Sequence, residues 1–150
     1  MSCGNIVVAV DGSEASQGAL DHAVNLARQS NTALTGIFII DSQWADFIDN
    51  DWQSAKGARQ GFLDYIRKEQ EEQAEAARAQ FEQATQGMKQ ASFSVYAGDP
   101  TDVLVEQASS GDTGILVAGR RVFQVSGRPS LKSLAATLTK KASRPLLLFP

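Results

Sequence analysis

A basic loop near the carboxyl end of the chain holds the residues best suited to chemistry. The stretch AGRRVFQVSGRPSLKS, residues 118–133, follows an apolar run and precedes a run with helical character. Gly119 ends the apolar run, and the loop carries positive charge on Arg120, Arg121 and Lys132. Backbone N–H groups at a helix N-terminus bind phosphate well, and basic side chains strengthen such a site. The types and spacing of these residues therefore predict an anion site.

The charge of the chain is divided unevenly along its length. Residues 1–112 hold all 17 acidic residues and 7 of the 14 basic ones, and residues 113–150 hold the other 7 basic residues. Lys140 and Lys141 complement the partial negative charge at the end of a predicted helix. The cations of the loop precede that helix, where this explanation does not apply. Such a division marks an anion-binding end, or a surface that meets the acidic part of a second copy.

Residues for catalysis are sparse elsewhere in the chain. The single histidine, His22, falls in the middle of a predicted helix, and the single cysteine, Cys3, precedes the first predicted strand. Neither can reach the strand ends to build a Ser-His-Asp or Cys-His arrangement. The sequence contains no GxxxxGK[ST] motif, no GxGxxG after the first strand and no metal-ligand spacing of His and Cys. We therefore do not expect an enzyme.

Alternating strands and helices must position the loop. Short apolar runs predict strands at 5–10, 33–40, 91–97, 114–118 and 145–149. Apolar residues at spacings of three and four predict helices after a Ser13 cap, over 62–88, after an Asp99 cap with Pro100 at the first position, and from Ser130. This order predicts an α/β fold with a parallel sheet and right-handed crossovers, in one domain over 1–150.

The carboxyl ends of the strands form the predicted ligand-binding edge. In a sheet of this kind, ligands bind beyond those ends, where the strand order reverses. Asp11, the strand end at Ile39 and Ile40, and Gly119 with its loop fall at this edge. Residues 42–61 lack a clean period and predict a long excursion nearby. Their aromatic residues either pack on the domain or a partner, or lie over a pocket.

Five stretches that span nearly the whole chain carry a family resemblance. They are VAVDGSEAS at 8–16, FIID at 38–41, GDPTDVLVEQA at 98–108, ILVAG at 115–119 and ASRPLLLF at 142–149. Together they resemble the universal stress protein family. The resemblance implies a flavodoxin-like, doubly wound sheet of five parallel strands in the order 3-2-1-4-5, with helices on both faces. It also implies a homodimer formed by antiparallel pairing of the last strand, residues 145–149.

The basic loop resembles the G-x2-G-x9-G-[ST] motif that the nucleotide-binding branch of that family carries after its fourth strand. Gly119 matches the first glycine and Ser133 the hydroxyl position, and the spacing between them is intact. Val122 and Lys132 stand where the other two glycines would be. The β-branched side chain of Val122 stands where a phosphate would approach the backbone, and a positive φ at this position would cost steric strain. Lys132 removes a point of close approach but adds a positive charge.

The resemblance also assigns residues to the nucleoside part of the site. Asp11 matches an acidic residue that contacts ribose or adenine, and Ile39 matches a position whose backbone faces adenine. The candidate nucleotide-binding residues are thus Asp11, Ile39, Gly119, Arg120, Arg121, Lys132 and Ser133. Two of them have a second interpretation, Asp11 as part of the Ser13 turn that caps the first helix and Ser133 as an ordinary helix residue.

Two functions are consistent with this pattern. The first is a non-enzymatic, dimeric stress-response adaptor or regulator of the branch that does not bind ATP, with protein partners that the sequence does not identify. The second is a sensor of an adenine nucleotide, ATP or AMP, or of another anion. In the sensor, the loop's cations, Arg128 among them, replace backbone N–H groups as phosphate partners. Slow ATP hydrolysis is a weaker variant of the second function.

The composition also bears on location and partners. No apolar run approaches the roughly 20 residues that a membrane helix needs. The N-terminus lacks the basic and apolar pattern of a signal peptide, and a single cysteine suits a reducing compartment. We therefore expect a cytoplasmic protein that has no membrane or nucleic-acid partner and no certain cofactor.

Overall fold

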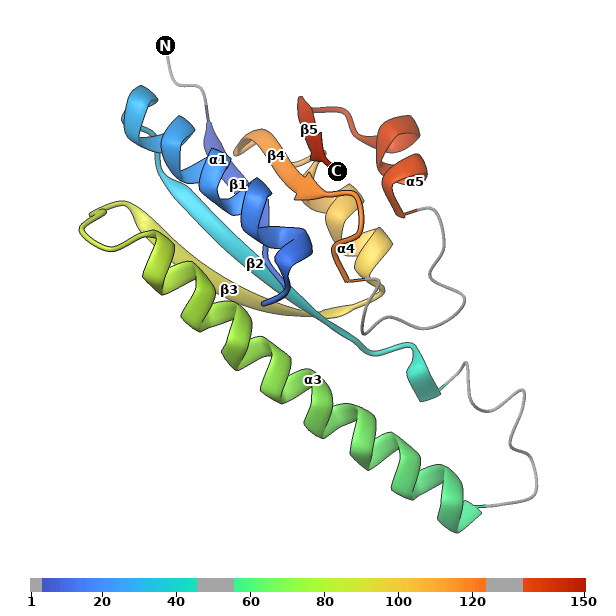
Figure 1. Ribbon diagram of the computed structural model, residues 1–150. Coiled ribbons are helices and arrows are strands. Elements are labelled where there is room, and N and C mark those ends of the chain that lie inside the picture. The colour runs from blue at the N-terminus through green and yellow to red at the C-terminus, as the bar shows by residue number, and fades with distance from the viewer. Residues whose placement is uncertain (1–3, 46–55, 124–133) are drawn as a thin grey trace.

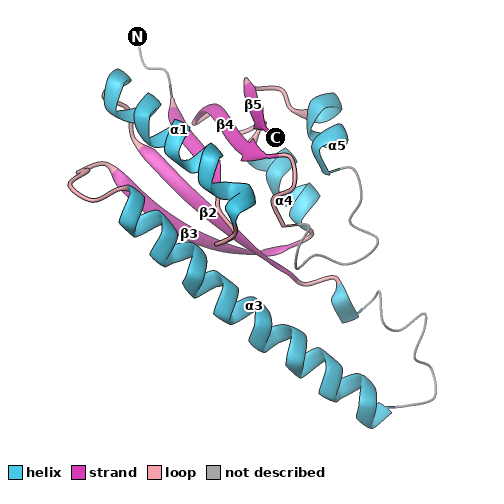
Figure 2. Ribbon diagram, viewed as in Figure 1, coloured by secondary structure: helices cyan, strands magenta, loops and turns pink. Residues whose placement is uncertain are grey.

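The computed structural model describes residues 4–45, 56–123 and 134–150 (Figures 1 and 2). Strands and helices alternate along the chain, as the sequence predicts. The strands are β1 (Asn5–Ala9), β2 (Leu34–Asp41), β3 (Ala91–Gly98), β4 (Thr113–Gly119) and β5 (Leu146–Phe149). The helices are α1 (Glu14–Ser30), α3 (Lys56–Ala84), α4 (Pro100–Gln107) and α5 (Leu134–Lys141).

The five strands form one parallel sheet in the order β3-β2-β1-β4-β5. This arrangement confirms the predicted flavodoxin-like fold class. Helices α1 and α3 cover one face of the sheet, and α4 and α5 cover the other (Figure 1). Because β1 lies between β2 and β4, the residues that follow these three strands meet at one edge of the sheet.

Burial on both faces explains the continuous apolar runs of the central strands. In β1, the residues from Ile6 to Ala9 are all buried, and β4 is buried from Leu116 to Gly119. The inner faces of α1 and α4 complete the core with Ala19, Leu20, Ala23, Val24, Ala27, Leu104 and Ala108. The predicted apolar stripes of α1 and α4 thus meet the sheet.

Both predicted helix caps are present. The Ser13 side chain accepts a hydrogen bond from Ala15 N, and the Asp99 side chain accepts one from Asp102 N. Pro100 occupies the start of α4, where its missing N–H costs nothing. Since caps satisfy orphan N–H groups at helix starts, they fix where α1 and α4 begin beyond the strand ends.

The long helix is displaced from its predicted bounds. It was predicted over 62–88, whereas α3 runs from Lys56 to Ala84. Its start therefore lies inside the stretch 42–61, which the sequence predicted to be irregular. The prediction began too late because the first apolar residue of the helical stripe comes about a turn and a half after Lys56. It ends early because Gly87 adopts a φ of 82° and Met88 N donates to the Thr85 carbonyl in a turn.

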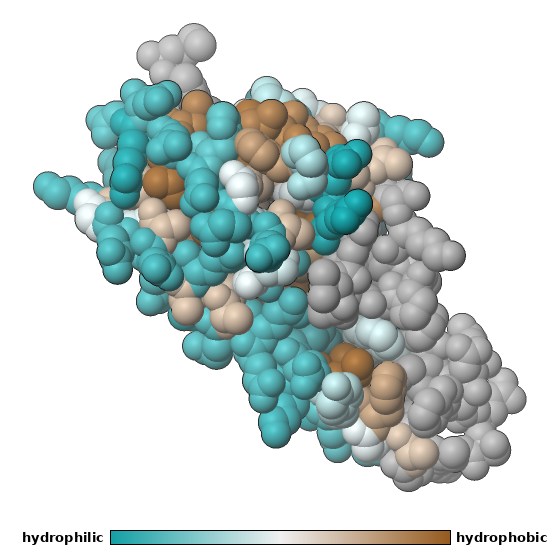
Figure 3. Space-filling view, in the orientation of Figure 1, coloured by the Kyte–Doolittle hydropathy of each residue, from teal (hydrophilic) through white to brown (hydrophobic). Residues whose placement is uncertain are grey.

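The surface in Figure 3 is mostly hydrophilic over α1 and α3, and apolar residues gather over the β4 and β5 end of the sheet. All four residues of β5 are half-buried and pack against the core. None of the described helices combines the length and the apolar character that crossing a bilayer requires.

Candidate functional site

The structure brings the turn after β1, the body of β2 and the loop after β4 together at the carboxyl edge of the sheet. The contact residue that sequence reasoning missed is Phe123. Its backbone N–H donates to Asp11 Oδ2 at 2.9 Å. Its ring meets Phe38 of β2 edge to face, with centroids 5.7 Å apart at 69°. Phe123 therefore joins three segments that lie far apart in the sequence.

The Asp11 carboxylate is buried, with no exposed surface, and both of its oxygens accept hydrogen bonds from the chain itself. Oδ1 accepts from Ser13 N at 3.0 Å and from Ser13 Oγ at 2.5 Å. Oδ2 accepts the bond from Phe123. This is the geometry of the second interpretation, in which Asp11 supports the turn that caps α1. A contact from Asp11 to a nucleoside stays a prediction, and it would compete with these bonds.

Gln80 of α3 fixes the same turn from the side. Its Oε1 accepts from Gly12 N at 3.1 Å and from Ser16 Oγ at 2.9 Å. Its Nε2 donates to the Ser13 carbonyl at 3.1 Å and to Gln17 Oε1 at 2.9 Å. A single glutamine thus bonds to four groups of the β1–α1 turn and of the first turn of α1. Sequence reasoning could not predict this role, because Gln80 lies 67 residues beyond Ser13.

Gly119 is buried at the end of β4, and its backbone passes directly against α1. A Cβ at this position would collide with the carbonyl oxygen of Ala15. The glycine is therefore required for the packing of α1 on β4, whether or not a phosphate binds. Arg120 N then donates to the Phe149 carbonyl at 2.7 Å, so the loop starts along β5. The side chains of Arg120 and Arg121 are exposed.

The next two residues turn inward. Val122 is fully buried, and its N–H donates to the Gly119 carbonyl at 3.1 Å. Phe123 is 2% exposed and has a φ of 67°. The positive φ that would cost strain at Val122 is therefore found at Phe123 and not at Val122. A left-handed backbone is an outlier for so bulky a residue, and it persists only where the surroundings hold it. The ring contact with Phe38 and the hydrogen bond to Asp11 stabilise this backbone conformation.

The other candidate residues are placed as follows. Ile39 is 2% exposed, pairs in register with Tyr96 and packs in the core, so only its backbone could face a ligand. Lys132 and Ser133 lie outside the described residues, as does Arg128. The nucleotide-binding role of the seven candidates stays a prediction.

The aromatic stretch after β2 is described only in part. Trp44 is 8% exposed and meets the Phe62 ring edge to face, with centroids 6.0 Å apart. It also lines a hollow of about 290 Å³ between the end of β2 and α3. Buried Gln70 also lines that hollow and bonds to both backbone groups of Asp41. Trp44 thus packs on α3 and also lines a hollow. Phe47 and Trp52 lie outside the described residues.

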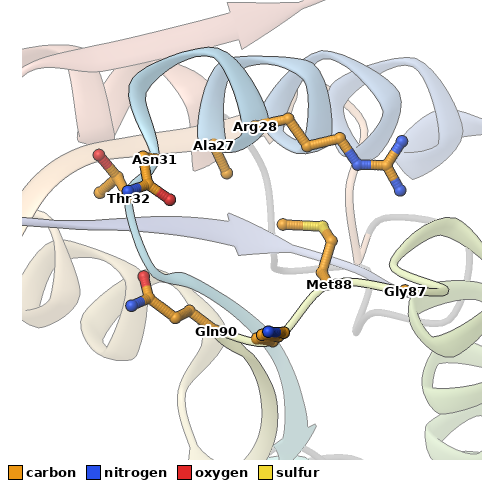
Figure 4. Close-up of a pocket in the computed structure, with 8 residues that line it drawn as sticks. Ala27, Arg28, Asn31, Thr32, Gly87, Met88 and Gln90 are labelled. Carbon is orange, nitrogen blue, oxygen red and sulfur yellow. The ribbon is translucent and has the colours of Figure 1, made fainter.

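A second hollow, of about 350 Å³, lies at the opposite, amino end of the sheet (Figure 4). Met88 reaches across it from the α3–β3 turn toward α1. Arg28 donates to the Gln86 carbonyl at 3.2 Å, just past the end of α3. The carboxyl ends of α1 and α3 converge there with their partial negative charges. The positive charge of Arg28 is explained by its interaction with these carbonyl groups.

His22 lies on the exposed side of α1, where its ring is 5.2 Å from that of Phe149. Phe149 ends β5 and pairs in register with Gly119, so His22 lies beside the carboxyl end of β5, contrary to the expectation that it cannot reach the strand ends. Among the residues that the structure describes, no group of three or more His, Cys, Asp or Glu could hold a metal ion.

The parallel order 3-2-1-4-5, with a loop after β4 closing on the end of β1, defines a flavodoxin-like α/β protein. The model of the universal stress protein family matches residues 3–150. The chain belongs to the universal stress protein family. No protein with a curated description matches the sequence.

Solved structures of the same family have the same fold. The universal stress protein UspA from Lactobacillus plantarum is 22% identical with a TM-score of 0.71, over 100% of this chain and 99% of that one. A universal stress protein in complex with cAMP is 23% identical with a TM-score of 0.64, over 98% and 97%. The universal stress protein from Archaeoglobus fulgidus in complex with dAMP is 21% identical with a TM-score of 0.59, over 100% of both chains.

Proposed function

We propose that this universal stress protein is a non-enzymatic, cytoplasmic adaptor or regulator of the branch that does not use ATP. One observation carries the proposal. The acidic residue matched to nucleoside contacts, Asp11, is buried and bonded on both oxygens, and one of these bonds comes from Phe123 N, whose ring packs on Phe38. The protein's own groups therefore occupy both oxygens of this carboxylate.

A nucleotide that reached Asp11 would have to displace these groups. Burial of a Phe side chain is worth about 1.5–3 kcal/mol, and a hydrogen bond to a charged group about 1.5–3 kcal/mol. Losing both would weaken nucleotide binding by about a hundredfold or more. Val122 adds to the effect, because its buried side chain occupies the second glycine position of the motif.

Mass spectrometry of small molecules released from freshly purified protein tests this proposal. We expect no adenine nucleotide in a stoichiometric amount. Recovery of ATP, AMP or a cyclic nucleotide at about one molecule per chain would contradict the proposal.

The alternative is a sensor of an adenine nucleotide or another anion. Two observations favour it: the exposed cations Arg120 and Arg121 begin the loop, and two family members were solved with cAMP and dAMP. In this reading, binding requires Phe123 to leave its place. The variant Arg120→Ala would then weaken nucleotide binding, and unchanged binding would exclude the sensor.

We also propose that the chain forms a homodimer through β5. Its four half-buried apolar residues form one edge of the sheet, and pairing with a second copy would cover them. The carbonyls of Pro145 and Phe149 bond to β4 and to Arg120 N, so backbone groups at Leu148 are directed outward.

Equilibrium sedimentation tests the dimer. We expect the wild-type chain to sediment as a dimer, and Leu148→Pro to sediment as a monomer because the variant lacks an outward N–H donor. Leu148→Val is the matched control and should remain dimeric. A monomeric wild-type chain at tens of micromolar would exclude this interface.

A further inference from the structure

Strand β3 forms the other edge of the sheet, and no described strand pairs with its outer side. Within the described residues, β2 is the only strand paired with β3. The carbonyls of Gln90 and Gly98 accept hydrogen bonds from Leu34 N and Ser42 N, so the even-numbered residues of β3 direct their backbone groups toward β2. Because these groups alternate along a strand, the odd-numbered residues 91–97 direct their N–H and C=O groups away from the sheet.

The residues of β3 itself carry none of the usual protection against another strand. Natural sheets protect their edges with charged residues, proline, bulges or very short strands. β3 is eight residues long, ASFSVYAG, and contains no charged residue and no proline. By comparison, β5 has four residues and lies between Pro145 and Pro150. β3 is therefore the edge with more backbone groups to offer.

Apolar side chains are exposed on both faces of β3 near its carboxyl end. Val95 is 39% exposed and Tyr96 is 38% exposed. Successive residues of a strand point to opposite faces. Phe93 lies on the α3 face, where Phe81 and Arg78 cover its ring, so Val95 shares that face and Tyr96 lies on the other. An added strand would cover both side chains.

The helices beside β3 give this edge an acidic setting. The exposed acidic residues on α3 and α4 are Asp64, Glu69, Glu71, Glu72, Glu75, Glu82, Asp102 and Glu106. The basic residues on α3 with described side chains are fewer: Arg67 and Lys68 are exposed, and Arg78 lies over the Phe93 ring at 5.0 Å. Two copies joined at β3 would bring one acidic α3 beside another, which disfavours self-pairing. A basic partner would be attracted.

We infer that the β3 edge binds an extended, Lys- or Arg-bearing segment of a partner protein by strand addition. The inference rests on the proposed adaptor function, for which it supplies a docking surface. Backbone hydrogen bonds to residues 91–97 give the affinity, and the contacts to Val95 and Tyr96 favour apolar residues in the partner. The acidic helices select basic residues at the remaining positions.

The test uses the full chain and a blocked eight-residue peptide in which Val and Thr alternate with Lys. Amide hydrogen exchange is followed by NMR with and without the peptide. At saturation, we expect exchange at Phe93, Val95 and Ala97 to slow by about tenfold or more, since their N–H groups gain partners. A peptide with Glu in place of Lys should bind at least about tenfold more weakly.

Two variants separate strand addition from other binding. Val95→Pro removes an outward donor and leaves the β2 ladder intact, so it should lose peptide binding. Val95→Thr keeps the donor and should bind as the wild type does. The exchange measurement on the wild-type chain decides the matter even if Val95→Pro does not fold.

Three outcomes would overturn the inference. They are unchanged exchange at millimolar peptide, equal binding by a folded Val95→Pro variant, and protection of these amides that rises with protein concentration without peptide. The last would identify a second copy as the occupant. Nucleotide binding at Asp11 would refute the proposed function without affecting the edge, so the two failures are distinguishable.

Discussion

Phe123 combines two features that seldom occur in one residue, a left-handed backbone and a buried aromatic ring. The φ of 67° is costly for a bulky side chain, while the ring is 2% exposed against Phe38. Its N–H also donates to buried Asp11. Packing and hydrogen bonding therefore hold a conformation that the isolated backbone would avoid.

This conflict predicts an unusual order of stability at position 123. Both Phe123→Ala and Phe123→Gly lose the ring, at a cost of about 3–5 kcal/mol. Glycine alone relieves the left-handed strain, so Phe123→Gly should be more stable than Phe123→Ala by about 1 kcal/mol. Urea denaturation measures the difference.

The neighbouring position supplies the control. Val122 is not in the left-handed region, so Val122→Ala should be more stable than Val122→Gly by about 0.5–1 kcal/mol. The same order at both positions would mean that Phe123 carries no backbone strain.

At this scale, the sequence predicted positions better than contacts. Asp11 and Gly119 lie at the carboxyl edge, as their place after apolar runs indicated. Which atoms would satisfy the Asp11 carboxylate could not be read from the sequence, because one of its partners, Phe123, is 112 residues away. Nor could the sequence show that Phe123, and not Val122, adopts the positive φ, since both are large apolar residues.

At the scale of elements, the close approach of α1 to β4 depends on Gly119. Its Cα faces the Ala15 carbonyl oxygen, and there is no room for a side chain. The first glycine of the motif thus has a structural role in this chain, which is to let α1 pack on β4. Its presence alone is not a sign of phosphate binding.

Adding a methyl group at Gly119 should therefore force α1 away from the sheet. We expect Gly119→Ala to destabilise the chain by about 1–3 kcal/mol or more. Thermal unfolding measures the effect. Gly61→Ala is the control, because a Cβ there meets nothing within 4 Å on exposed α3 and should stabilise by about 0.5–1 kcal/mol. A harmless Gly119→Ala substitution would show that α1 is not held against β4.

The sequence predicted the elements because their signals are local. Apolar runs, helix caps and the proline at α4 are signals carried by a few neighbouring residues. The strand bounds predicted from the apolar runs agree with the observed bounds within a residue or two. The bounds of α3 were less well predicted, since its first turns carry no apolar stripe. The glutamines that join α3 to the strand ends, Gln70 and Gln80, act between distant segments and have no local signal.

At the scale of the whole molecule, the parallel sheet separates two regions. At the carboxyl edge, where sheets of this kind bind ligands, Asp11, Val122 and Phe123 are buried and Phe123 N donates to Asp11. The β3 edge presents open backbone groups beside acidic helices. Together these features fit a protein that meets other proteins rather than one that holds a nucleotide.

Thermal unfolding with and without millimolar ATP or AMP tests the occupied site most directly. Because Phe123 and Ser13 already satisfy Asp11, we expect the wild-type Tm to be unchanged by either nucleotide. A ligand at a hundredfold its Kd would add about 2.7 kcal/mol, which corresponds to a rise of about 5–10 °C for a chain of this length. Such a rise, absent in Asp11→Ala, would contradict the proposal and establish a working nucleotide site.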